Sequence, residues 1–558
     1  MSTIIRSRYL LTAAWVITLS IACVTWAAPA RPKPVAPEAT KPAGSDILKT
    51  STTTPAERAR LRRQLFQKAR KVAALNRKLT AYFQAGQYDK CEPVIKQILE
   101  ISPHNPIAWY NYACYQSRVG QGDKAIESLT RAIEHGYSSF GYLERDPDLD
   151  AIRKLPDYRK LRALQDRVQR ERASKVREAL VKQFGKDYVY EIDHDRKLVF
   201  ATNVDSQTLS EMKQRLTTYA TVQWKDLFDN TFEKYLTIVI PRKKDWRWGQ
   251  RVGGFYARSS HMLIARTVGL TLVHEFTHAL HYADQEGFGQ SHPIWITEGL
   301  ATLFESSRIV DGHAVPTTNS RLNALQRLLR RKAQIPLSEL IRASHARFMQ
   351  NPTASYSEVR YFMMYLHSKG MLRKWYDAYV EGYDSDRTGR ASLEKVFGRK
   401  LDKIEADWHE WVMDQEPALT RLPRDSAYIG IQLTQAIDGV EVVRVIPGGG
   451  ADKAGLKGGD VILQIDEVRT IEPAQLLKVV NSHDAGDQVK IRYRRDGKYQ
   501  AVAVTLTKMP PARRLPRLRP IRPATTAPTT KPATSRPAGP PKRRTLPPVR
   551  KTDRKKAA

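Results

Sequence analysis

The sequence of 558 residues predicts a multidomain protein that joins an α-helical repeat region, an α+β domain and a small β-rich domain. Three observations lead to this prediction. The chain is too long for one hydrophobic core. In the first third of the chain, helical patterns of apolar residues repeat at a long, regular interval. After residue 424, short segments of alternating apolar residues are separated by glycine-rich turns. Segments near both ends are rich in Pro and basic residues, cannot bury a core and are expected to be disordered.

The formal net charge of +34 raises the question of a nucleic-acid partner. Residues 509–558 contain fifteen Lys and Arg residues against one acid, Asp553, so about +14 of the charge lies in this Pro-rich tail. Elsewhere the charges are of mixed sign, and no RNA-binding or helix-turn-helix pattern accompanies them. The composition gives no support for a dedicated nucleic-acid domain, while the basic tail is suited to contacts with acidic surfaces.

Residues 1–27 have the pattern of an export signal. Two arginines precede an uncharged apolar run over residues 9–24, and the small residue Ala27 allows cleavage after it. The run is short for a membrane span, which favours cleavage over a retained anchor. A lipoprotein attached through Cys23 is a further, less favoured alternative. We therefore expect an exported protein, periplasmic or extracellular, with a Pro-rich linker over residues 28–55.

A period of thirty-four residues marks the helical region, which we place at residues 56–165. Small and apolar residues recur at this period: Gly86 with Gly120, Cys91 with Ala125, Ile95 with Leu129, and Ile98 with Ala132. Over residues 72–140 the pattern resembles tetratricopeptide repeats. The resemblance implies stacked helix pairs that offer a concave surface to protein segments. An ordinary helical hairpin is the alternative.

The cysteines give no sign of a nucleophile or a zinc finger. Cys23 lies in the export signal, whereas Cys91 and Cys114 fall in the helical repeats. Export would allow a disulfide between these two, but small buried thiols are the favoured interpretation.

Residues 166–415 predict the α+β domain. Residues 188–192, 197–202 and 235–240 alternate or run apolar like strands, with a helical period between the last two. Residues 253–265 suggest an edge hairpin. After residue 268 the pattern is almost wholly helical. A small sheet followed by a run of helices is typical of the α+β class.

The most specific chemical pattern is His274-Glu275-Phe276-Thr277-His278. Residues four apart lie on one face of a helix, so His274 and His278 can direct their imidazoles to one point. Two neutral imidazoles supply half of a tetrahedral zinc shell. Glu275 is placed to take a proton from a metal-bound water rather than to bind the metal.

A third ligand follows twenty residues after His278. Pro293 can begin a second helix, which carries Glu298 in the sequence Trp-Ile-Thr-Glu-Gly. If this helix runs against the first, the Glu298 carboxylate meets the two imidazoles, and the fourth position stays open for water, as in a catalytic zinc site. The pattern resembles gluzincin metallopeptidases, and residues from about 185 to 415 more specifically resemble the peptidase-MA-like group. The resemblance implies one Zn²⁺ ion. A structural helix with fortuitous histidines and a metal-binding but inactive domain are the alternatives.

The resemblance also implies a hydrogen-bond donor for the oxyanion that forms during peptide hydrolysis. Our candidate is Tyr356, with Tyr361 as second choice, and simple packing of either ring is the alternative. Glu305 lies two helical turns beyond Glu298, where it could orient a ligand histidine or merely be exposed. His281 is expected to be structural. The strand at residues 253–257 would pair with an extended substrate.

Residues 424–508 predict the small β-rich domain. The glycine-rich run at residues 446–456, the segment Gly458-Gly459-Asp460 and the turn Asp496-Gly497 resemble a bacterial-type PDZ domain. The resemblance implies that an extended C-terminal peptide binds beside the second strand. The corresponding segment is Tyr428-Ile429-Gly430-Ile431, in which Gly430 permits a close backbone approach. A purely structural role for this segment is the alternative.

Two functions from different classes follow. The first is a zinc-dependent peptidase in which Glu275 is the general base and the two binding modules recruit protein or peptide substrates. The second is a non-catalytic scaffold of the cell envelope that binds proteins through the same modules. A basic nucleic-acid binder is a weaker third.

Overall fold

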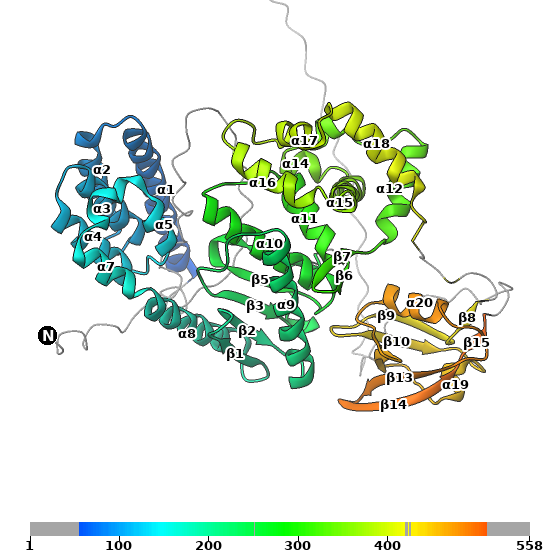
Figure 1. Cartoon of the computed structure of the whole chain (residues 1–558). Coiled ribbons are helices and arrows are strands. Elements are labelled where there is room, and N and C mark those ends of the chain that lie inside the picture. The colour runs from blue at the N-terminus through cyan, green and yellow to red at the C-terminus, as the bar shows by residue number, and fades with distance from the viewer. Residues whose placement is uncertain (1–54, 250–251, 419–421, 423–425, 510–558) are drawn as a thin grey trace, which may run out of the picture. The chain divides into compact units, whose positions relative to one another are not determined.

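A computed structural model describes residues 55–249, 252–418, 422 and 426–509, all within one compact unit that ends at Met509 (Figure 1). The predicted export signal, nearly all of the Pro-rich linker and the basic tail after Met509 lie outside these residues. Among the described helices, none is both long and apolar enough to cross a membrane.

The first part of the described chain is helical. Asn105 caps α3, since its side-chain oxygen accepts hydrogen bonds from the N–H groups of Ile107 and Ala108. Gly86 and Gly120, one predicted period apart, adopt positive φ angles of 67° and 76° after α1 and α3. The helices are α1 (Pro55–Gln84), α2 (Cys91–Ile101), α3 (Pro106–Arg118), α4 (Gly122–Glu134), α5 (Phe140–Arg145), α6 (Asp150–Arg153), α7 (Pro156–Ala163) and α8 (Gln165–Phe184).

These helices enclose a core of their own, and Cys91 and Cys114 lie buried in it as thiols that form no disulfide. The Sγ atom of Cys114 lies 3.6 Å from the Asp146 carboxylate, which also accepts a hydrogen bond from Tyr110. The paired helices agree with the expected helical region, while their membership of the tetratricopeptide family stays a prediction.

A mixed five-stranded sheet, in the order β1-β2-β3-β5-β4, forms the centre of the next region. β2, β3 and β5 are parallel, and β1 and β4 are antiparallel edge strands. Adjacent residues face opposite sides: Phe200 packs towards α9 and α10, whereas Val199 packs towards α8. The strands are β1 (Val189–Asp193), β2 (Leu198–Thr202), β3 (Leu236–Ile240), β4 (Gly254–Ala257) and β5 (Met262–Ala265).

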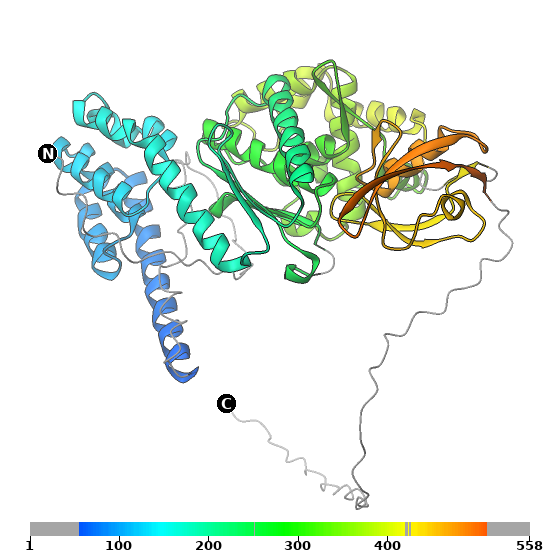
Figure 2. The same cartoon turned by 90° about the horizontal axis from the view of Figure 1, so that it is seen from below.

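Figures 1 and 2 show α8 along one side of this sheet, with α9 and α10 on the other. The largest core of the described residues lies on the α9–α10 side and includes the fully buried Trp295, Trp375 and Trp408. The helices of this region are α9 (Ser206–Asp226), α10 (Leu270–Phe288), α11 (Ile294–Glu305), α12 (Ser320–Arg330), α13 (Leu337–Leu340), α14 (His345–Phe348), α15 (Pro352–Ser368), α16 (Leu372–Gly382), α17 (Arg390–Phe397) and α18 (Leu401–Asp414).

A hairpin interrupts the segment that the sequence predicts to be almost wholly helical. β6 (Ser307–Val310) pairs antiparallel with β7 (His313–Pro316). Asp311 and Gly312 connect them with φ angles of 50° and 72°. An Asp-Gly pair with two positive φ angles is a strong hairpin turn, so the local turn residues override the surrounding helical pattern. The segment is otherwise helical, so the expectation of an almost wholly helical region missed only this hairpin among the described residues.

The C-terminal domain is rich in short strands, as predicted. Its main sheet has the order β14-β13-β11-β10-β9, with β12 beside β11, and α20 packs near β8 and β9. Its core contains Leu476 and Val480 from α20. The elements are β8 (Ala427–Tyr428), β9 (Ile431–Gln435), β10 (Val440–Val445), α19 (Gly450–Lys453), β11 (Val461–Ile465), β12 (Val468–Arg469), α20 (Pro473–Asn481), β13 (Gln488–Arg495), β14 (Lys498–Thr505) and β15 (Thr507–Lys508).

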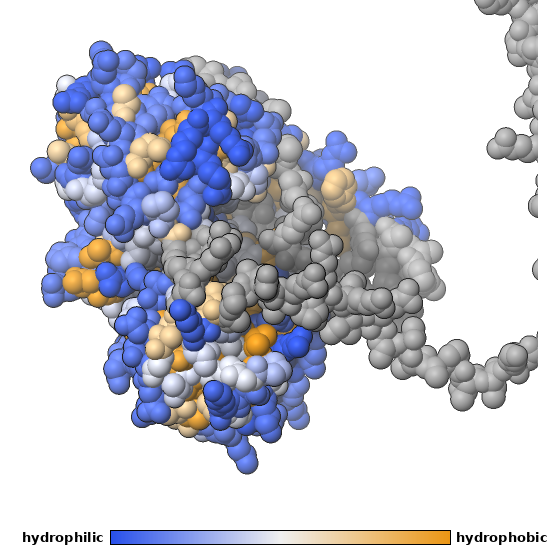
Figure 3. Space-filling view, turned by 90° about the vertical axis from the view of Figure 1, so that its right-hand side faces the viewer, coloured by the Kyte–Doolittle hydropathy of each residue, from blue (hydrophilic) through white to orange (hydrophobic). Residues whose placement is uncertain are grey.

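Figure 3 shows a face on which hydrophilic side chains predominate and hydrophobic ones occur in small groups. Scattered apolar residues are normal on a folded surface.

Glu358 of α15 is a carboxyl group buried in the main core. Its side chain is fully buried, and its Oε1 atom accepts a hydrogen bond of 2.8 Å from the N–H of Ile335. Burial raises the pKa of Glu358 from about 4.5 to about 8. Between about pH 4.5 and about pH 8, Glu358 is protonated in the folded chain and ionised in the unfolded chain. Its contribution to the unfolding free energy therefore falls as the pH rises through this range.

Glu358→Gln should remove this pH dependence, because the amide keeps an acceptor for Ile335 and carries no proton to lose. At pH 8 we expect the unfolding free energy of the variant to exceed that of the wild type by a few kcal/mol, since each pKa unit corresponds to about 1.4 kcal/mol. At about pH 5 this difference should disappear. Thermal unfolding across this pH range measures it. Glu410→Gln, an exposed change on α18, is the control. Parallel pH profiles for the wild type and Glu358→Gln would contradict the prediction.

Candidate metal centre

Helix α10 positions the two histidines of the motif. The helix ends at Gly289, whose φ of 68° is the left-handed conformation that commonly terminates a helix. His274 and His278 are one turn apart, and their ring centroids lie 4.8 Å from each other. His278 is buried and His274 is partly buried, so both rings lie largely away from bulk water.

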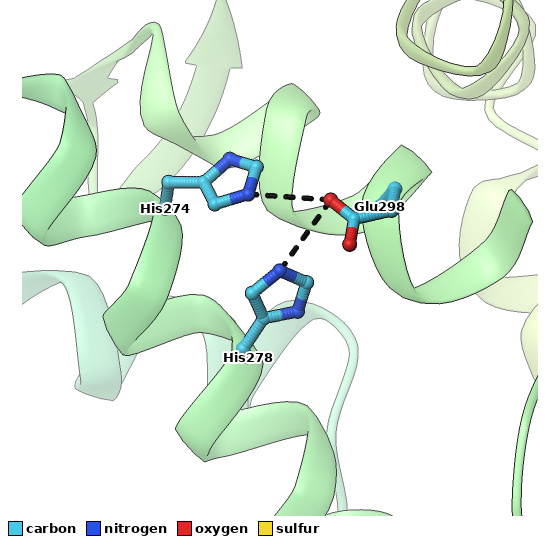
Figure 4. Close-up of side chains that lie close together, drawn as sticks. All are labelled: His274, His278 and Glu298. Carbon is cyan, nitrogen blue, oxygen red and sulfur yellow. Dashed lines mark ion pairs between the residues drawn. The ribbon is translucent and has the colours of Figure 1, made fainter. Parts of the chain in front are cut away.

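Helix α11 brings Glu298 to the same point (Figure 4). One carboxylate oxygen, Oε2, lies 3.3 Å from His274 Nε2 and 3.5 Å from His278 Nε2. All three ligand atoms lie within 4.8 Å of one another. The sequence predicted that these residues converge, and the structure brings them together.

The charges in this cluster depend on one another. Burial would by itself lower the pKa of His274, but the carboxylates of Glu298 and Glu305 hold it well above its usual range. Burial opposes ionisation of Glu298, whereas the two imidazoles hold its pKa well below the usual range. The arrangement thus favours an ionised carboxylate between two nitrogen ligands.

Glu275 lies next to the first histidine and faces the edge strand β4. A Cβ atom on Gly254 would lie 3.2 Å from Glu275 Cγ and 2.7 Å from Thr271 Cγ2, so only glycine allows this approach of strand and helix. Burial raises the pKa of Glu275, although the imidazoles of His274 and His278 lower it. The carboxyl group can therefore hold a proton more readily than an exposed glutamate.

Glu305, at the end of α11, contacts the far side of the first histidine. Its Oε2 atom lies 2.8 Å from His274 Nδ1, and its other oxygen pairs with Arg321. Although the carboxyl is buried, His274 and Arg321 lower the pKa of Glu305 to about 2. A carboxylate that accepts a hydrogen bond from Nδ1 fixes the tautomer that leaves Nε2 free to bind a metal ion.

Tyr356 of α15 lies beside the cluster. Its ring centroid is 6.5 Å from that of His274, and it packs edge-on against Phe348. Burial raises the pKa of Tyr356, and the negative charges of the nearby Glu298 and Glu275 raise it further. The second choice, Tyr361, is fully buried and its hydroxyl accepts a hydrogen bond from the N–H of Asn319. Of the two tyrosines, only Tyr356 lies at the cluster.

The sequence reasoning missed two neighbours of the cluster. Tyr282 is one turn beyond His278 on α10, its ring 6.4 Å from that of His278, and the i+4 spacing could have revealed it. Arg321, on α12, has no local signal because only the tertiary fold brings it to Glu305. His281 is buried and bonds through Nε2 to Nδ1 of His292, which agrees with the expected structural role.

In the C-terminal domain, the segment Tyr428-Ile429-Gly430-Ile431 connects β8 to β9. Tyr428 pairs with Thr507 of β15, and Ile431 begins β9, which is an edge of the main sheet. Gly430 has a φ of 89°, and a Cβ atom there would lie 3.0 Å from Gly449 Cα. The close approach that was expected at Gly430 is therefore made to the chain's own backbone.

Comparison with known families assigns this domain. Residues 427–506 match the PDZ domain family. The C-terminal domain is a PDZ domain. Such domains bind protein or peptide partners, typically by pairing an extended peptide with an exposed strand. In this domain β9 is an edge strand of the main sheet.

Relatives resemble this chain over the PDZ domain. A DegP-like periplasmic serine endoprotease of Marinomonas is 37% identical over 13% of this chain and 16% of its own length. A serine protease Do-like HtrA of Lactococcus lactis is 40% identical over 12% of this chain and 17% of its own. Among solved structures, the PDZ domain of HtrA3 bound to a phage-derived peptide covers 15% of this chain and 88% of its own at 16% identity, with a TM-score of 0.14. The chain thus spans only a small part of the curated relatives it matches.

Gly430→Ala should destabilise the PDZ domain, because alanine resists a positive φ and its Cβ would press on Gly449. We expect a loss of roughly 2 to 3 kcal/mol in unfolding free energy. Gly497→Ala is a matched control: its φ is 78°, but a Cβ there meets no atom within 4 Å. It should cost only about 1 kcal/mol. Denaturant unfolding of the full chain measures both, and equal losses would contradict the contact.

Proposed function

We propose that this protein is an exported zinc-dependent peptidase of the gluzincin type, with one Zn²⁺ ion bound by His274, His278 and Glu298. The observation that carries the proposal is the convergence of these three ligand atoms within 4.8 Å, with Glu275 beside them. Two imidazoles and a carboxylate are a ligand set used by catalytic zinc sites. Export is supported by the pattern of residues 1–27.

The separations of the ligand atoms fit a metal ion better than direct hydrogen bonds. The Glu298 oxygen is 3.3 and 3.5 Å from the two Nε2 atoms, longer than a usual N–H···O bond of about 2.9 Å. Two ligands bound tetrahedrally at about 2.0–2.1 Å from zinc lie about 3.4 Å apart. The bond from His274 Nδ1 to Glu305 is the partner that a metal-binding histidine normally has.

Bound zinc would polarise the peptide carbonyl and acidify a water molecule. The protein's own groups would carry the proton. Glu275, whose pKa burial raises, would accept a proton from the water and deliver it to the leaving amine. The hydroxyl of Tyr356, held beside Glu298, is the candidate donor to the developing oxyanion.

Substrate would be an extended polypeptide. β4 is an edge strand of the five-stranded sheet and passes directly beside Glu275, so a peptide added to it would lie next to the general base. The PDZ domain and the helical region at α1–α7 would recruit protein substrates. We assign the PDZ domain the capture of an extended C-terminal peptide through Ile431 and the rest of β9.

A second candidate function is a non-catalytic scaffold of the cell envelope. It is favoured by the family match, which covers the PDZ domain, a protein-binding module. In that case the His274, His278 and Glu298 cluster would be a buried set of ion pairs. Metal content and digestion of a peptide library, measured together, separate the two functions.

The first test is metal content and cleavage of a peptide library by the wild type and Glu275→Gln. We expect about one zinc per chain in both, cleavage by the wild type, and loss of at least about a hundredfold in kcat for the variant, because only the proton acceptor is removed. Glu410→Gln, exposed on α18, should cleave like the wild type. Zinc without any cleavage by the wild type would favour the scaffold, and full activity of Glu275→Gln would exclude this base.

Tyr356→Phe tests the oxyanion donor. Removal of the hydroxyl should lower kcat by about a hundredfold or more and leave KM nearly unchanged, because the bond forms only in the transition state. Zinc content should stay the same, since the tyrosine is no ligand. Unchanged kcat would mean that the Tyr356 ring serves packing against Phe348.

A further inference from the structure

The N-terminus of helix α10 has no cap from its own segment. The residue before its first turn, Gly269, has no side chain, and the first turn contains no acidic residue. The first four N–H groups of any helix need partners outside the helix. This helix carries His274, Glu275 and His278, so the order of its first turn bears directly on the candidate site.

The missing cap comes from the PDZ domain. The carboxylate oxygen Oε1 of Glu472 accepts a hydrogen bond of 2.6 Å from the N–H of Leu270, the first residue of α10. A Cβ atom on Gly269 would lie 2.6 Å from the same oxygen, so the glycine leaves the space that the carboxylate occupies. A negative charge at this end also interacts favourably with the helix dipole.

The residues that precede α10 are fixed by the same domain. The N–H of Val268 donates to the carbonyl of Ile437, which follows β9, at 2.7 Å. The guanidinium of Arg215, from α9, donates to the carbonyls of Val268 and Gly269. The backbone at the start of α10 is therefore bound by Glu472 and Ile437 of the PDZ domain and by Arg215 of α9.

Further polar contacts hold the PDZ domain in place here. Asp438 is completely buried, pairs with Arg494 of its own domain and accepts a bond of 3.2 Å from the hydroxyl of Thr208 on α9. Arg469 Nε donates to Glu211 of α9 at 3.0 Å. Directional polar contacts of this kind, one of them to a buried carboxylate, favour one relative position over others.

Glu472 is also the N-cap residue of α20, where its N–H donates to the side chain of Gln475. α20 packs near β9, the edge strand with which a peptide would pair. One residue thus joins the N-terminus of the zinc-site helix to the element that flanks the peptide-binding strand.

We propose that Glu472 is a positioning residue, through which the PDZ domain orders the first turn of α10 and so fixes His274, one turn further on. The capping role stands on the geometry alone, and its consequence for catalysis rests on the proposed peptidase function. The PDZ domain is then part of the structure of the catalytic site as well as a module that recruits partners.

Hydrogen–deuterium exchange of the metal-free full-length protein tests the cap without reference to activity. Glu472→Ala should speed exchange of the amides at residues 270–273 by about tenfold, as expected when a helix loses an N-terminal cap. Glu472→Gln, which keeps an oxygen acceptor without the charge, should restore most of the protection. Glu467→Ala, an exposed change in the same domain, should leave exchange unchanged. Equal exchange in Glu472→Ala and Glu467→Ala would overturn the proposal.

A second variant guards against simple unfolding of the PDZ domain. Gly269→Ala leaves every PDZ residue intact but places a Cβ where the Glu472 oxygen lies. Gly269→Ala should speed exchange of the same amides. The double variant Gly269→Ala/Glu472→Ala should show no further increase, because both changes remove the same interaction. Additive effects would refute the shared interaction.

The effect of Glu472 on the candidate metal site is measured as the zinc affinity of the full-length protein. Glu472→Ala should bind zinc about tenfold more weakly than the wild type and Glu467→Ala, because a mobile first turn spreads the positions of His274. If exchange changes but zinc affinity does not, the coupling to the metal site is refuted. If the wild type binds zinc and cleaves nothing, the peptidase function fails while the exchange result stands.

Discussion

The contact between α10 and α11 is the constraint on which the candidate site depends. It brings His274 and His278, one helical turn apart on α10, and Glu298 of α11 to one point, where the three side chains could hold a metal ion. On its other side α11 lies close to α15, because the residue after Glu298 is Gly299, where a Cβ atom would lie 2.9 Å from the Met363 side chain of α15. α11 is thus clamped between α10 and α15, and Glu298 has little freedom to leave the two imidazoles.

Charge balance is the second requirement of this cluster. Glu275 and Glu305 are buried acidic groups and Glu298 is partly buried beside them, and unpaired charge in such a place is costly. The imidazoles and Arg321 offset part of the negative charge, and a divalent cation would offset more. The same reasoning explains why the three carboxyl groups differ: the pKa of Glu298 and Glu305 is lowered by their partners, whereas burial raises that of Glu275. The lowered pKa values suit Glu298 as a candidate ligand and Glu305 as the carboxylate that supports His274. The raised pKa suits Glu275 as the group that carries a proton.

The PDZ domain has a dual position in this chain. Its β9 strand is an edge suited to an extended peptide, which is the general property of its family. Through Glu472 and Ile437 it also contacts the residues at which α10 begins. A recruiting module on a flexible tether would need no buried contact such as Asp438 with Thr208. The interface therefore argues that the domain is fixed against α9 and α10 rather than freely attached.

The sequence by itself determined what local patterns can encode. The i, i+4 pair His274 and His278 needs only a helix, and the PDZ turns are fixed by glycines at positive φ. The strands of the five-stranded sheet were predicted to within one or two residues, because apolar alternation reports burial on each face. The hairpin at Asp311-Gly312 was missed because the expectation of helix was carried across a clear turn signal.

Only the tertiary structure decided which distant groups complete these patterns. Whether Glu298 reaches the imidazoles, and whether Tyr356 rather than Tyr361 lies beside them, depends on how three helices pack. Arg321 behind Glu305 and Glu472 at the start of α10 have no signal in the sequence, because they meet their partners 16 and 202 residues away along the chain. Long-range contacts of this kind follow from side-chain packing in a common core, which no local period or motif records.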